Sequence, residues 1–128
     1  MAYVRVWIHA VWSTKTRFPF LNDSIRQKVF KHMASNARSK RIVIDRINGY
    51  VDHVHCLIAL RSTQSLAQVI NQIKGESSRW INKNKLTKEH FEWQTDYFAC
   101  SVGESAIAAL RAYIDNQALH HGKTTLPV

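Results

Sequence analysis

Residues 41–60 read RIVIDRINGYVDHVHCLIAL, and this stretch decides the fold. Its first part, residues 41–47, and its last part, residues 50–60, are rich in β-branched and apolar side chains, which favour strands. Between them stands Asn48-Gly49, a dipeptide that is a strong signal for a hairpin turn. The stretch therefore predicts two antiparallel strands joined by a tight turn in the middle of the chain.

The segments around this hairpin predict a strand and a helix before it, and two helices and a strand after it. In chain order they are a strand at residues 3–13, a helix at 25–39, a helix at 65–81, a strand at 91–102 and a helix at about 104–121. The candidate N-caps are Asn22, Asp23 and Ser24 for the first helix and Ser65 for the second. The order β-α-β-β-α-β-α predicts an α+β fold, a ferredoxin-like or RNA-recognition-motif-like sandwich with an added C-terminal helix. We expect a single domain over residues 1–128, with its sheet core within about 1–102.

The composition and charge narrow the classes of function. The chain has 128 residues, of which 45% are hydrophobic and 21% charged, so it is neither disordered nor a coiled coil. Lysine and arginine together number 18, against 9 aspartates and glutamates, which gives a net charge of +9. A small protein this basic commonly binds a polyanion.

Other features of the sequence indicate the compartment. No run of about 18 apolar residues is present, and the start of the chain lacks the pattern of a signal peptide. The two cysteines, Cys56 and Cys100, form neither a metal-type cluster nor a disulfide framework. We therefore expect a cytoplasmic protein with no membrane partner, whose polyanion is DNA or RNA.

Two histidines, His53 and His55, stand at positions i and i+2 in the second strand of the hairpin. On a strand this spacing places both imidazoles on one face, about 7 Å apart along the chain, while Val54 points to the opposite face. Two imidazoles so placed can bind one divalent metal ion. The alternative is that both rings are partly buried and satisfied by hydrogen bonds. Asp52 is expected to face the other way, so it is not a predicted ligand.

The last helix carries a second pair of polar side chains. Tyr113 and Gln117 are four residues apart and share a helical face. In one interpretation Tyr113 is a packing residue and Gln117 is solvated. In the other, the Tyr113 hydroxyl attacks a phosphodiester and the Gln117 amide oxygen is a third metal ligand. Histidine and glutamine ligands are neutral, so a metal that they hold keeps its full positive charge for the phosphate.

Together these residues resemble a known family. His53-Val54-His55 is similar to the His-hydrophobic-His motif of HUH endonucleases. With a single tyrosine in a later helix, the chain resembles the single-tyrosine HUH transposases of the IS200/IS605 insertion-sequence group. The resemblance extends over most of the chain, through the segments at residues 9–15, 50–58, 93–99 and 113–117.

This resemblance implies a DNA transposase that cleaves and rejoins single-stranded DNA with hairpins. Tyr113 would be the nucleophile and form a 5′-phosphotyrosine intermediate, while His53, His55 and Gln117 would bind Mg²⁺ or Mn²⁺. The family implies a homodimer with shared active sites. Relatives often continue further beyond the tyrosine helix than this sequence, which ends at residue 128, so a naturally shortened copy or a trimmed form is expected.

Basic side chains outside the motifs predict a surface that binds DNA phosphates. The candidate nucleic-acid-binding residues are Lys15, Arg17, Lys74, Arg79 and Lys83. Two alternatives to a mobile transposase stay open. One is a domesticated relative that nicks or binds hairpin repeats, and the other is a non-catalytic nucleic-acid-binding module of the same fold. The histidines in residues 50–60 argue against an RNA-recognition motif, which would have aromatic residues there.

Overall fold

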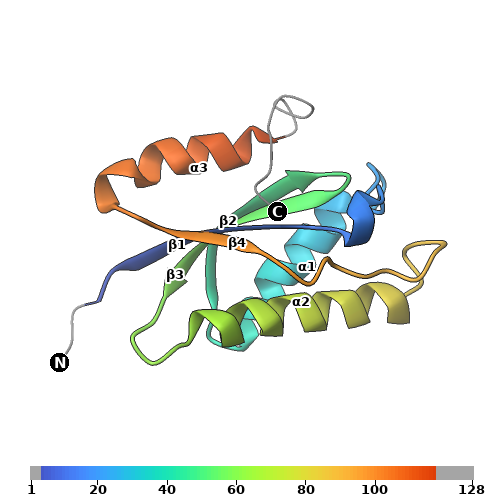
Figure 1. Ribbon diagram of the computed structural model, residues 1–128, viewed down its shortest axis with the longest axis horizontal. Helices are drawn as coiled ribbons and strands as arrows, with labels where there is room; N and C mark the ends of the chain where they lie inside the picture. Colours follow the sequence, from blue (N-terminus) through green and yellow to red (C-terminus); the bar gives the residue numbers. More distant parts are fainter. Residues whose placement is uncertain (1–3, 118–128) are drawn as a thin grey trace.

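The computed structural model describes residues 4–117, which form one four-stranded antiparallel sheet with helices on both faces (Figure 1). The strands are β1 (Val6–Ser13), β2 (Val43–Tyr50), β3 (His53–Leu60) and β4 (Phe98–Val102), in the spatial order β2-β3-β1-β4. The helices are α1 (Arg26–Ser39), α2 (Leu66–Lys83) and α3 (Ile107–Asp115), with short 3-10 helices η1 (Lys15–Arg17) and η2 (Glu104–Ala106). This is the α+β sandwich with an added helix that the sequence predicts.

Helices α1 and α2 cover one face of the sheet and enclose the main core (Figure 1). Trp12 of β1, Ile58 of β3, Phe30 of α1 and Ile70 of α2 are all almost completely buried there. The alternation of side chains along β1 and β3 places these residues on the same face. Removal of this apolar surface from water is the main source of stability.

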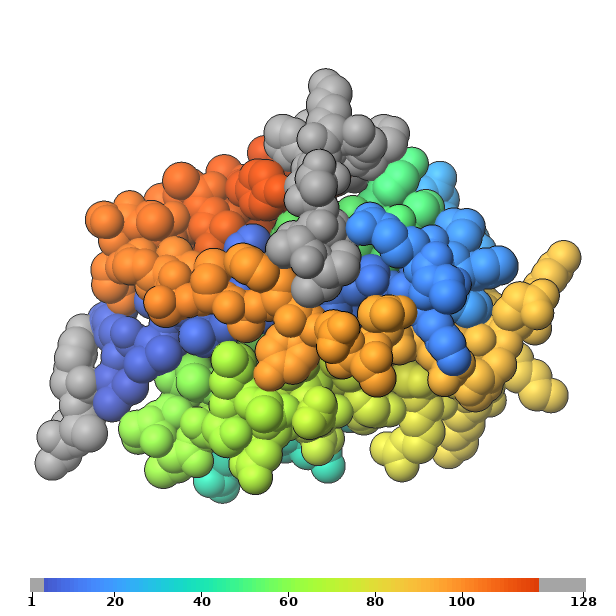
Figure 2. Space-filling view, in the orientation of Figure 1, coloured from blue at the N-terminus to red at the C-terminus, as the bar shows by residue number. Residues whose placement is uncertain are grey.

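Helix α3 packs across the opposite face of the sheet (Figure 1). Its residues Ile107 and Ile114 pack with Leu57 of β3, and Trp7 of β1 lies at the edge of this smaller cluster. Both faces of the inner strands β1 and β3 are therefore covered. In Figure 2, α3 (orange) lies above, α2 (yellow-green) below, and the segment at residues 15–22 (blue) beside them.

The turn of the β2–β3 hairpin lies at Val51-Asp52, so the prediction of a turn at Asn48-Gly49 is wrong. Gly49 instead lies within β2, opposite Val54 of β3. A Cβ on Gly49 would meet the carbonyl oxygen of His53, and would lie 2.9 Å from the Cα of Val54. The glycine therefore permits a close approach of the two strands beside the histidines.

The fourth strand is shorter than the predicted span of 91–102, because regular pairing begins only at Phe98. Before it, Trp93 makes a single isolated bridge just beyond β1. Asn82 of α2 hydrogen-bonds both backbone polar groups of Phe91, at 2.8 and 3.0 Å, and so replaces the sheet ladder there. Phe91 and Trp93 are buried in the main core, so their strand-like pattern reflects burial rather than pairing.

The helix ends agree in part with the predicted caps. Helix α2 begins behind Ser65, whose Oγ accepts a hydrogen bond from the backbone N–H of Gln68 at 3.4 Å. Helix α1 begins at Arg26 without a side-chain cap, because Asn22 Oδ1 accepts from Ser24 in a turn before the helix.

The predicted continuation of the last helix to about residue 121 lies outside the described residues. Among residues 4–117, no helix is both long and apolar enough to cross a membrane.

Candidate active site

The two histidines of β3 lie side by side at the start of that strand, on the face that α3 covers. His53 is 6% exposed and His55 is 2% exposed, and their ring centroids are 5.2 Å apart. Strand β3 is an inner strand, in which His55 pairs with Val11 of β1 and with Asn48 of β2. Pairing on both sides fixes the backbone from which the two rings project.

Helix α3 brings Tyr113 and Gln117 to the same histidines. The ring centroid of Tyr113 lies 5.7 Å from that of His55. Gln117, just after the end of α3, is 1% exposed, and its Oε1 lies 3.5 Å from Nε2 of His53. The Gln117 amide nitrogen donates to the carbonyl of Tyr113 at 3.4 Å, which directs Oε1 toward the histidine. A single chain thus assembles all four predicted residues.

Polar contacts from β2 hold α3 in this position, among them an ion pair between Arg46 and Asp115 at 3.4 Å. Arg111 makes a bidentate pair with Asp45, with distances of 2.8 Å and 3.0 Å. The Asn48 amide donates to the carbonyl of Asp115 at 3.1 Å, where the last turn of a helix leaves its carbonyls without partners. Asn48 therefore fixes the helix end from which Gln117 extends.

Asp52 orients the ring of His53. One of its carboxylate oxygens lies 2.9 Å from Nδ1 of His53, and the other accepts from Nε of Arg17 at 3.1 Å. Burial alone would raise the pKa of Asp52, but its hydrogen bonds with His53 and Arg17 outweigh burial and lower that pKa. The ionised carboxylate of Asp52 can only accept, so Nδ1 of His53 carries the proton and donates to it. In the neutral ring this leaves Nε2 of His53 as an acceptor.

Three acceptor atoms of the site have lone pairs and meet no donor from residues 4–117. Nε2 of His53 and Oε1 of Gln117 face each other, and neither carries a proton when His53 donates to Asp52. Nε2 of His55 is buried and has no hydrogen-bond partner within the described part of the chain. A bound cation would satisfy all three atoms. Two imidazole nitrogens and one amide oxygen therefore fit a divalent metal ion.

His9 is within hydrogen-bond distance of the second ring nitrogen of His55, Nδ1. The two rings are stacked, and Nε2 of His9 lies 3.0 Å from Nδ1 of His55. Burial lowers the pKa of His55 to about 3, with smaller contributions from the charges of His53 and His9. Burial also lowers the pKa of His9. His55 is therefore neutral near pH 7, the state in which an imidazole nitrogen binds a metal.

Sequence reasoning does not place His9 or Asp52 among the catalytic or metal-binding residues, although it allows His9 a position beside the site. Asp52 lies in the hairpin turn, where the alternation of a regular strand does not hold, so its side chain reaches His53. His9 meets His55 only through the register of β1 with β3, in which Val11 pairs with His55. The one signal in the sequence is that His9 and Val11 share a row on the first strand.

The predicted nucleic-acid-binding residues lie in two groups: Lys15 and Arg17 in η1, and Lys74, Arg79 and Lys83 on α2. Lys15 pairs with Glu92 at 3.0 Å, and Arg17 pairs with Asp52 of the site. Lys74 is half-buried and donates to three backbone carbonyls of the loop before β4. Burial lowers its pKa, and the charge of Asp96 partly opposes this shift. Lys74 therefore has a structural role in holding that loop.

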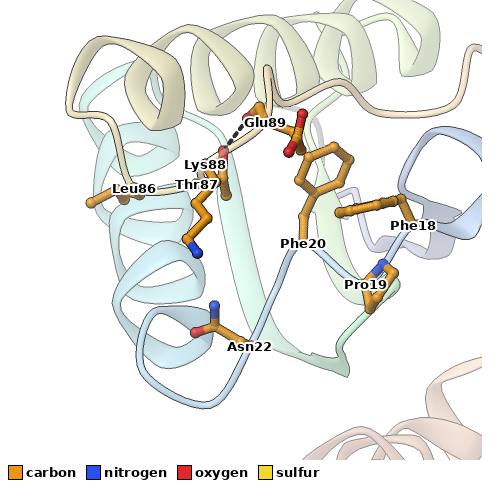
Figure 3. A pocket seen from close by; sticks show the side chains of 8 residues that line it. All are labelled: Phe18, Pro19, Phe20, Asn22, Leu86, Thr87, Lys88 and Glu89. Carbon is orange, nitrogen blue, oxygen red and sulfur yellow. Dashed lines mark hydrogen bonds between the residues drawn. The ribbon is translucent and has the colours of Figure 1, made fainter.

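A cavity of about 400 Å³ opens between the loop at residues 18–22 and the loop at residues 86–89 (Figure 3). Phe18 and Phe20 line one side, with ring centroids 4.6 Å apart, and Lys88 and Glu89 line another. None of His53, His55, Tyr113, Gln117 and the five candidate nucleic-acid-binding residues lines this cavity. It is therefore a feature separate from the histidine site.

The chain is similar to known transposases. Residues 2–117 match the family described as IS200-like transposases. The sequence is 24% identical over 115 residues to the ISDra2 transposase TnpA of Deinococcus radiodurans, a match that covers 85% of this chain and 81% of that protein.

Two solved structures share the fold. One is a crystal structure of a Deinococcus radiodurans R1 protein assigned as a transposase, with a TM-score of 0.72 and 23% identity over 91% of this chain and 95% of that one. The other is a REP-associated tyrosine transposase bound to a REP hairpin, with a TM-score of 0.68 and 16% identity over 97% of this chain and 73% of that one. At these identities the likeness supports the α+β fold.

Proposed function

The chain belongs to the IS200-like transposase family, a family of enzymes that cleave DNA and transfer its strands, and from this premise we propose the chemistry of its site. We propose that the protein cleaves and rejoins single-stranded DNA through a covalent bond between Tyr113 and a 5′-phosphate. The observation that carries the proposal is the position of Tyr113, whose ring lies 5.7 Å from that of His55, beside three acceptor atoms that lack donors.

In the cleavage step, the hydroxyl oxygen of Tyr113 attacks the phosphorus of the scissile phosphodiester and releases its proton to solvent. The bond from phosphorus to the tyrosine oxygen forms while the bond to the 3′ oxygen breaks. The departing 3′ oxygen takes up a proton and leaves as a free 3′-hydroxyl. A 3′-hydroxyl from another strand reverses the step and joins new DNA without ATP, because one phosphodiester bond replaces another.

We propose that His53, His55 and Gln117 hold Mg²⁺ or Mn²⁺. A divalent ion on neutral ligands supplies its full positive charge to the scissile phosphate. Asp52 keeps His53 in the tautomer whose Nε2 is an acceptor, and His9 does the same for His55 by accepting from its Nδ1. Tyr113 lies on the anchored helix α3, and Gln117 lies just after its end with its amide nitrogen on the carbonyl of Tyr113, so the nucleophile and a metal ligand stay close together.

The proposed substrate is single-stranded DNA that contains hairpins, in the cytoplasm. The REP-associated relative was solved with a REP hairpin bound, and the net charge of +9 suits a dense array of phosphates. Arg17 pairs with Asp52, the residue before His53, and Lys15 lies in the same short helix η1, so we propose that both contact the strand that reaches Tyr113.

We also propose a homodimer with shared active sites. Helix α3 follows β4 through Gly103 and η2, and a Cβ on Gly103 would meet nothing within 4 Å. The link is therefore open at Gly103, while the next residue, Glu104, accepts from Nε1 of Trp7 at 2.8 Å. If α3 crosses to the sheet of a partner, the contacts of Arg111 and Asn48 re-form between subunits, so the exchange conserves them.

A denaturing gel tests the proposed function. The protein is incubated with single-stranded DNA that carries a hairpin, in Mn²⁺ or Mg²⁺, and the products are separated in detergent. We expect a covalent protein–DNA adduct together with a fragment that ends in a 3′-hydroxyl. Binding with no cleavage in either metal would reject the enzyme and favour the non-catalytic alternative. Cleavage without strand joining would instead indicate a domesticated nicking protein.

A further inference from the structure

The short turn η1, beside the histidines, contains two consecutive residues in the left-handed region. Thr16 has a φ of 55° and Arg17 has a φ of 58°. Neither residue is a glycine, and this conformation costs free energy in a residue that has a Cβ. Such a turn persists only where the surrounding structure holds it. The contacts of η1 therefore show which side chain this turn places.

Hydrogen bonds hold η1 from two sides. The backbone N–H of Thr14, just before the turn, donates to the carbonyl of Asp52 at 2.9 Å. The hydroxyl of Thr14 donates to the carbonyl of Phe18 at 2.7 Å, which closes the turn. The backbone N–H of Thr16 donates to Oε1 of Gln94 at 3.3 Å. The turn is thus tied both to the β2–β3 connection and to the segment before β4 (Figure 1).

The turn places the guanidinium of Arg17 on the carboxylate of Asp52. Nε of Arg17 donates to Oδ2 at 3.1 Å, while Oδ1 of the same carboxylate lies 2.9 Å from Nδ1 of His53. The side chain of Asp52 is 21% exposed, so water competes for its oxygens. A carboxylate that is held through both oxygens has fewer orientations than one held through a single oxygen. Arg17 therefore restricts the group that orients His53.

We infer that Arg17 is a positioning residue for the metal site, which holds Asp52 so that His53 keeps its proton on Nδ1 and presents Nε2 to the ion. This inference rests on the proposed function, because it concerns the same metal site. Partners of a metal-binding histidine fix its tautomer and ring orientation, and here the partner itself is fixed by a further residue. The Arg17 side chain is 43% exposed and has other N–H groups, so this role is compatible with a contact to a DNA phosphate.

The charge of Arg17 predicts the opposite effect on metal binding. A guanidinium close to a bound cation repels it, so removal of that charge alone would strengthen metal binding. Loss of positioning would weaken metal binding instead, because His53 would no longer be held in the tautomer that binds. The direction of the change in metal affinity therefore separates the two effects.

Binding of Mn²⁺ to the DNA-free protein, measured by electron paramagnetic resonance of the unbound ion, tests the inference. Arg17→Met removes the charge and all donors but keeps most of the side-chain length. Arg17→Gln also removes the charge, yet its amide nitrogen occupies the position of Nε and still donates. Lys15→Met is the matched control, because it removes the same charge from η1, where Lys15 pairs with Glu92 and not with Asp52.

We expect Arg17→Met to bind Mn²⁺ about tenfold more weakly, the lower end of the effect of such partners. Arg17→Gln should stay within about threefold of the wild type, because it keeps the hydrogen bond to Asp52. Lys15→Met should bind Mn²⁺ equally or slightly more tightly. Asp52→Ala should itself weaken binding, and adding Arg17→Met to it should change the Kd by less than about twofold, because the group on which Arg17 acts is gone.

Nitrogen-15 NMR of the metal-free protein gives a second measurement. We expect a single tautomer of His53 in the wild type, with the proton on Nδ1, and a mixture of both tautomers in Arg17→Met. A merely structural role of Arg17 would lower the unfolding temperature and leave the tautomer unchanged. If Arg17→Met does not fold, Arg17→Gly takes its place, because glycine adopts the left-handed conformation without strain.

The contrary results are specific. Unchanged or tighter Mn²⁺ binding by Arg17→Met would overturn the inference, and so would equal losses in Arg17→Met and Arg17→Gln. A full further loss on adding Arg17→Met to Asp52→Ala would show that Arg17 does not act through Asp52. If His53→Ala bound Mn²⁺ as the wild type does, the proposed metal site would fail as well. If His53→Ala lost binding while Arg17→Met kept it, this inference alone would fail.

Discussion

His9 and His55 meet across neighbouring strands, with Nε2 of His9 3.0 Å from Nδ1 of His55. When Nδ1 of His55 donates to His9, the buried Nε2 of His55 keeps its lone pair, the form that binds a metal. Asp52 has the same effect on His53. If the site binds a metal as proposed, its affinity should therefore depend on two side chains, His9 and Asp52, that are not themselves proposed ligands.

Replacing His9 tests this dependence. His9→Phe keeps an aromatic ring but removes the acceptor, and we expect metal affinity to fall about 10–100-fold. The measurement is the Mn²⁺ concentration for half-maximal DNA cleavage. His32→Phe is the control, because His32 stacks on Trp80 between α1 and α2, away from the site. An unchanged midpoint in His9→Phe would show that His9 does not orient His55.

Loss of a single hydroxyl should stop the covalent step. Tyr113→Phe should form no protein–DNA adduct, while its Kd for hairpin DNA stays within about twofold, because only the nucleophile is removed. Tyr97→Phe is the matched control and should still form the adduct. If the adduct persisted in Tyr113→Phe and disappeared in Tyr97→Phe, the nucleophile would be Tyr97.

Changing the charge of the third ligand should separate metal binding from catalysis. Gln117→Ala should lower metal affinity moderately, because two imidazoles remain, whereas His53→Ala should abolish cleavage. Gln117→Glu should bind the metal more tightly but cleave more slowly, since its negative charge cancels part of the metal charge at the phosphate. Single-turnover cleavage across a Mn²⁺ titration measures both quantities. Faster cleavage by Gln117→Glu at saturating metal would contradict the role of neutral ligands.

The metal-free protein should lose stability in mild acid. Burial lowers the pKa of His55 from 6.5 to about 3, so only the unfolded chain takes up a proton on this residue in that range. The contribution is fully present above pH 6.5 and is lost as the pH falls toward 3. Between pH 6.5 and 5 the free energy of unfolding should drop by about 2 kcal/mol from this residue.

Urea unfolding with a chelator measures this loss at each pH. His55→Gln cannot take up the proton, so its unfolding free energy should fall less over the same interval. The difference between the two proteins isolates His55 from the other titrating groups. Parallel pH profiles in the wild type and His55→Gln would show that His55 does not couple protonation to folding.

Mixing two inactive proteins tests the shared dimer. His53→Ala and Tyr113→Phe chains are combined under conditions in which subunits exchange. If α3 crosses between subunits, one site of each mixed dimer has intact histidines and an intact tyrosine, so cleavage returns. If each chain completes its own site, both sites stay inactive. No recovery, with exchange verified by a tagged subunit, would reject the shared arrangement.

Local patterns in the sequence predict the element order and the clustering of the main site residues. The two-residue period of β1 and β3 assigns their side chains to faces, and it puts His53 and His55 on the same one. The helical spacing of Tyr113 and Gln117 then brings both to a single face of α3. The family resemblance supplies the step that local patterns lack, namely that these two faces meet.

Features that depend on strand register or on loops cannot be predicted from the spacing of side chains along the sequence. Gly49 has the signature of a turn, but its role is set by how closely Val54 approaches on the next strand. Phe91 alternates like a strand residue, yet Asn82 of α2, nine residues earlier, satisfies its backbone. In both cases the outcome depends on which partner the backbone meets, and the alternation of side chains does not encode that choice.

The place of β1 in the sheet also has a consequence for biosynthesis. The ribosome makes β1 before both of its partners, β3 on one side and β4 on the other. Strand β4 is made almost ninety residues after β1, and α3 follows it. A nascent chain therefore holds an open strand edge on β1 until β4 has been made. A product that ends before α3 lacks Tyr113 and Gln117, and so lacks half of the candidate site.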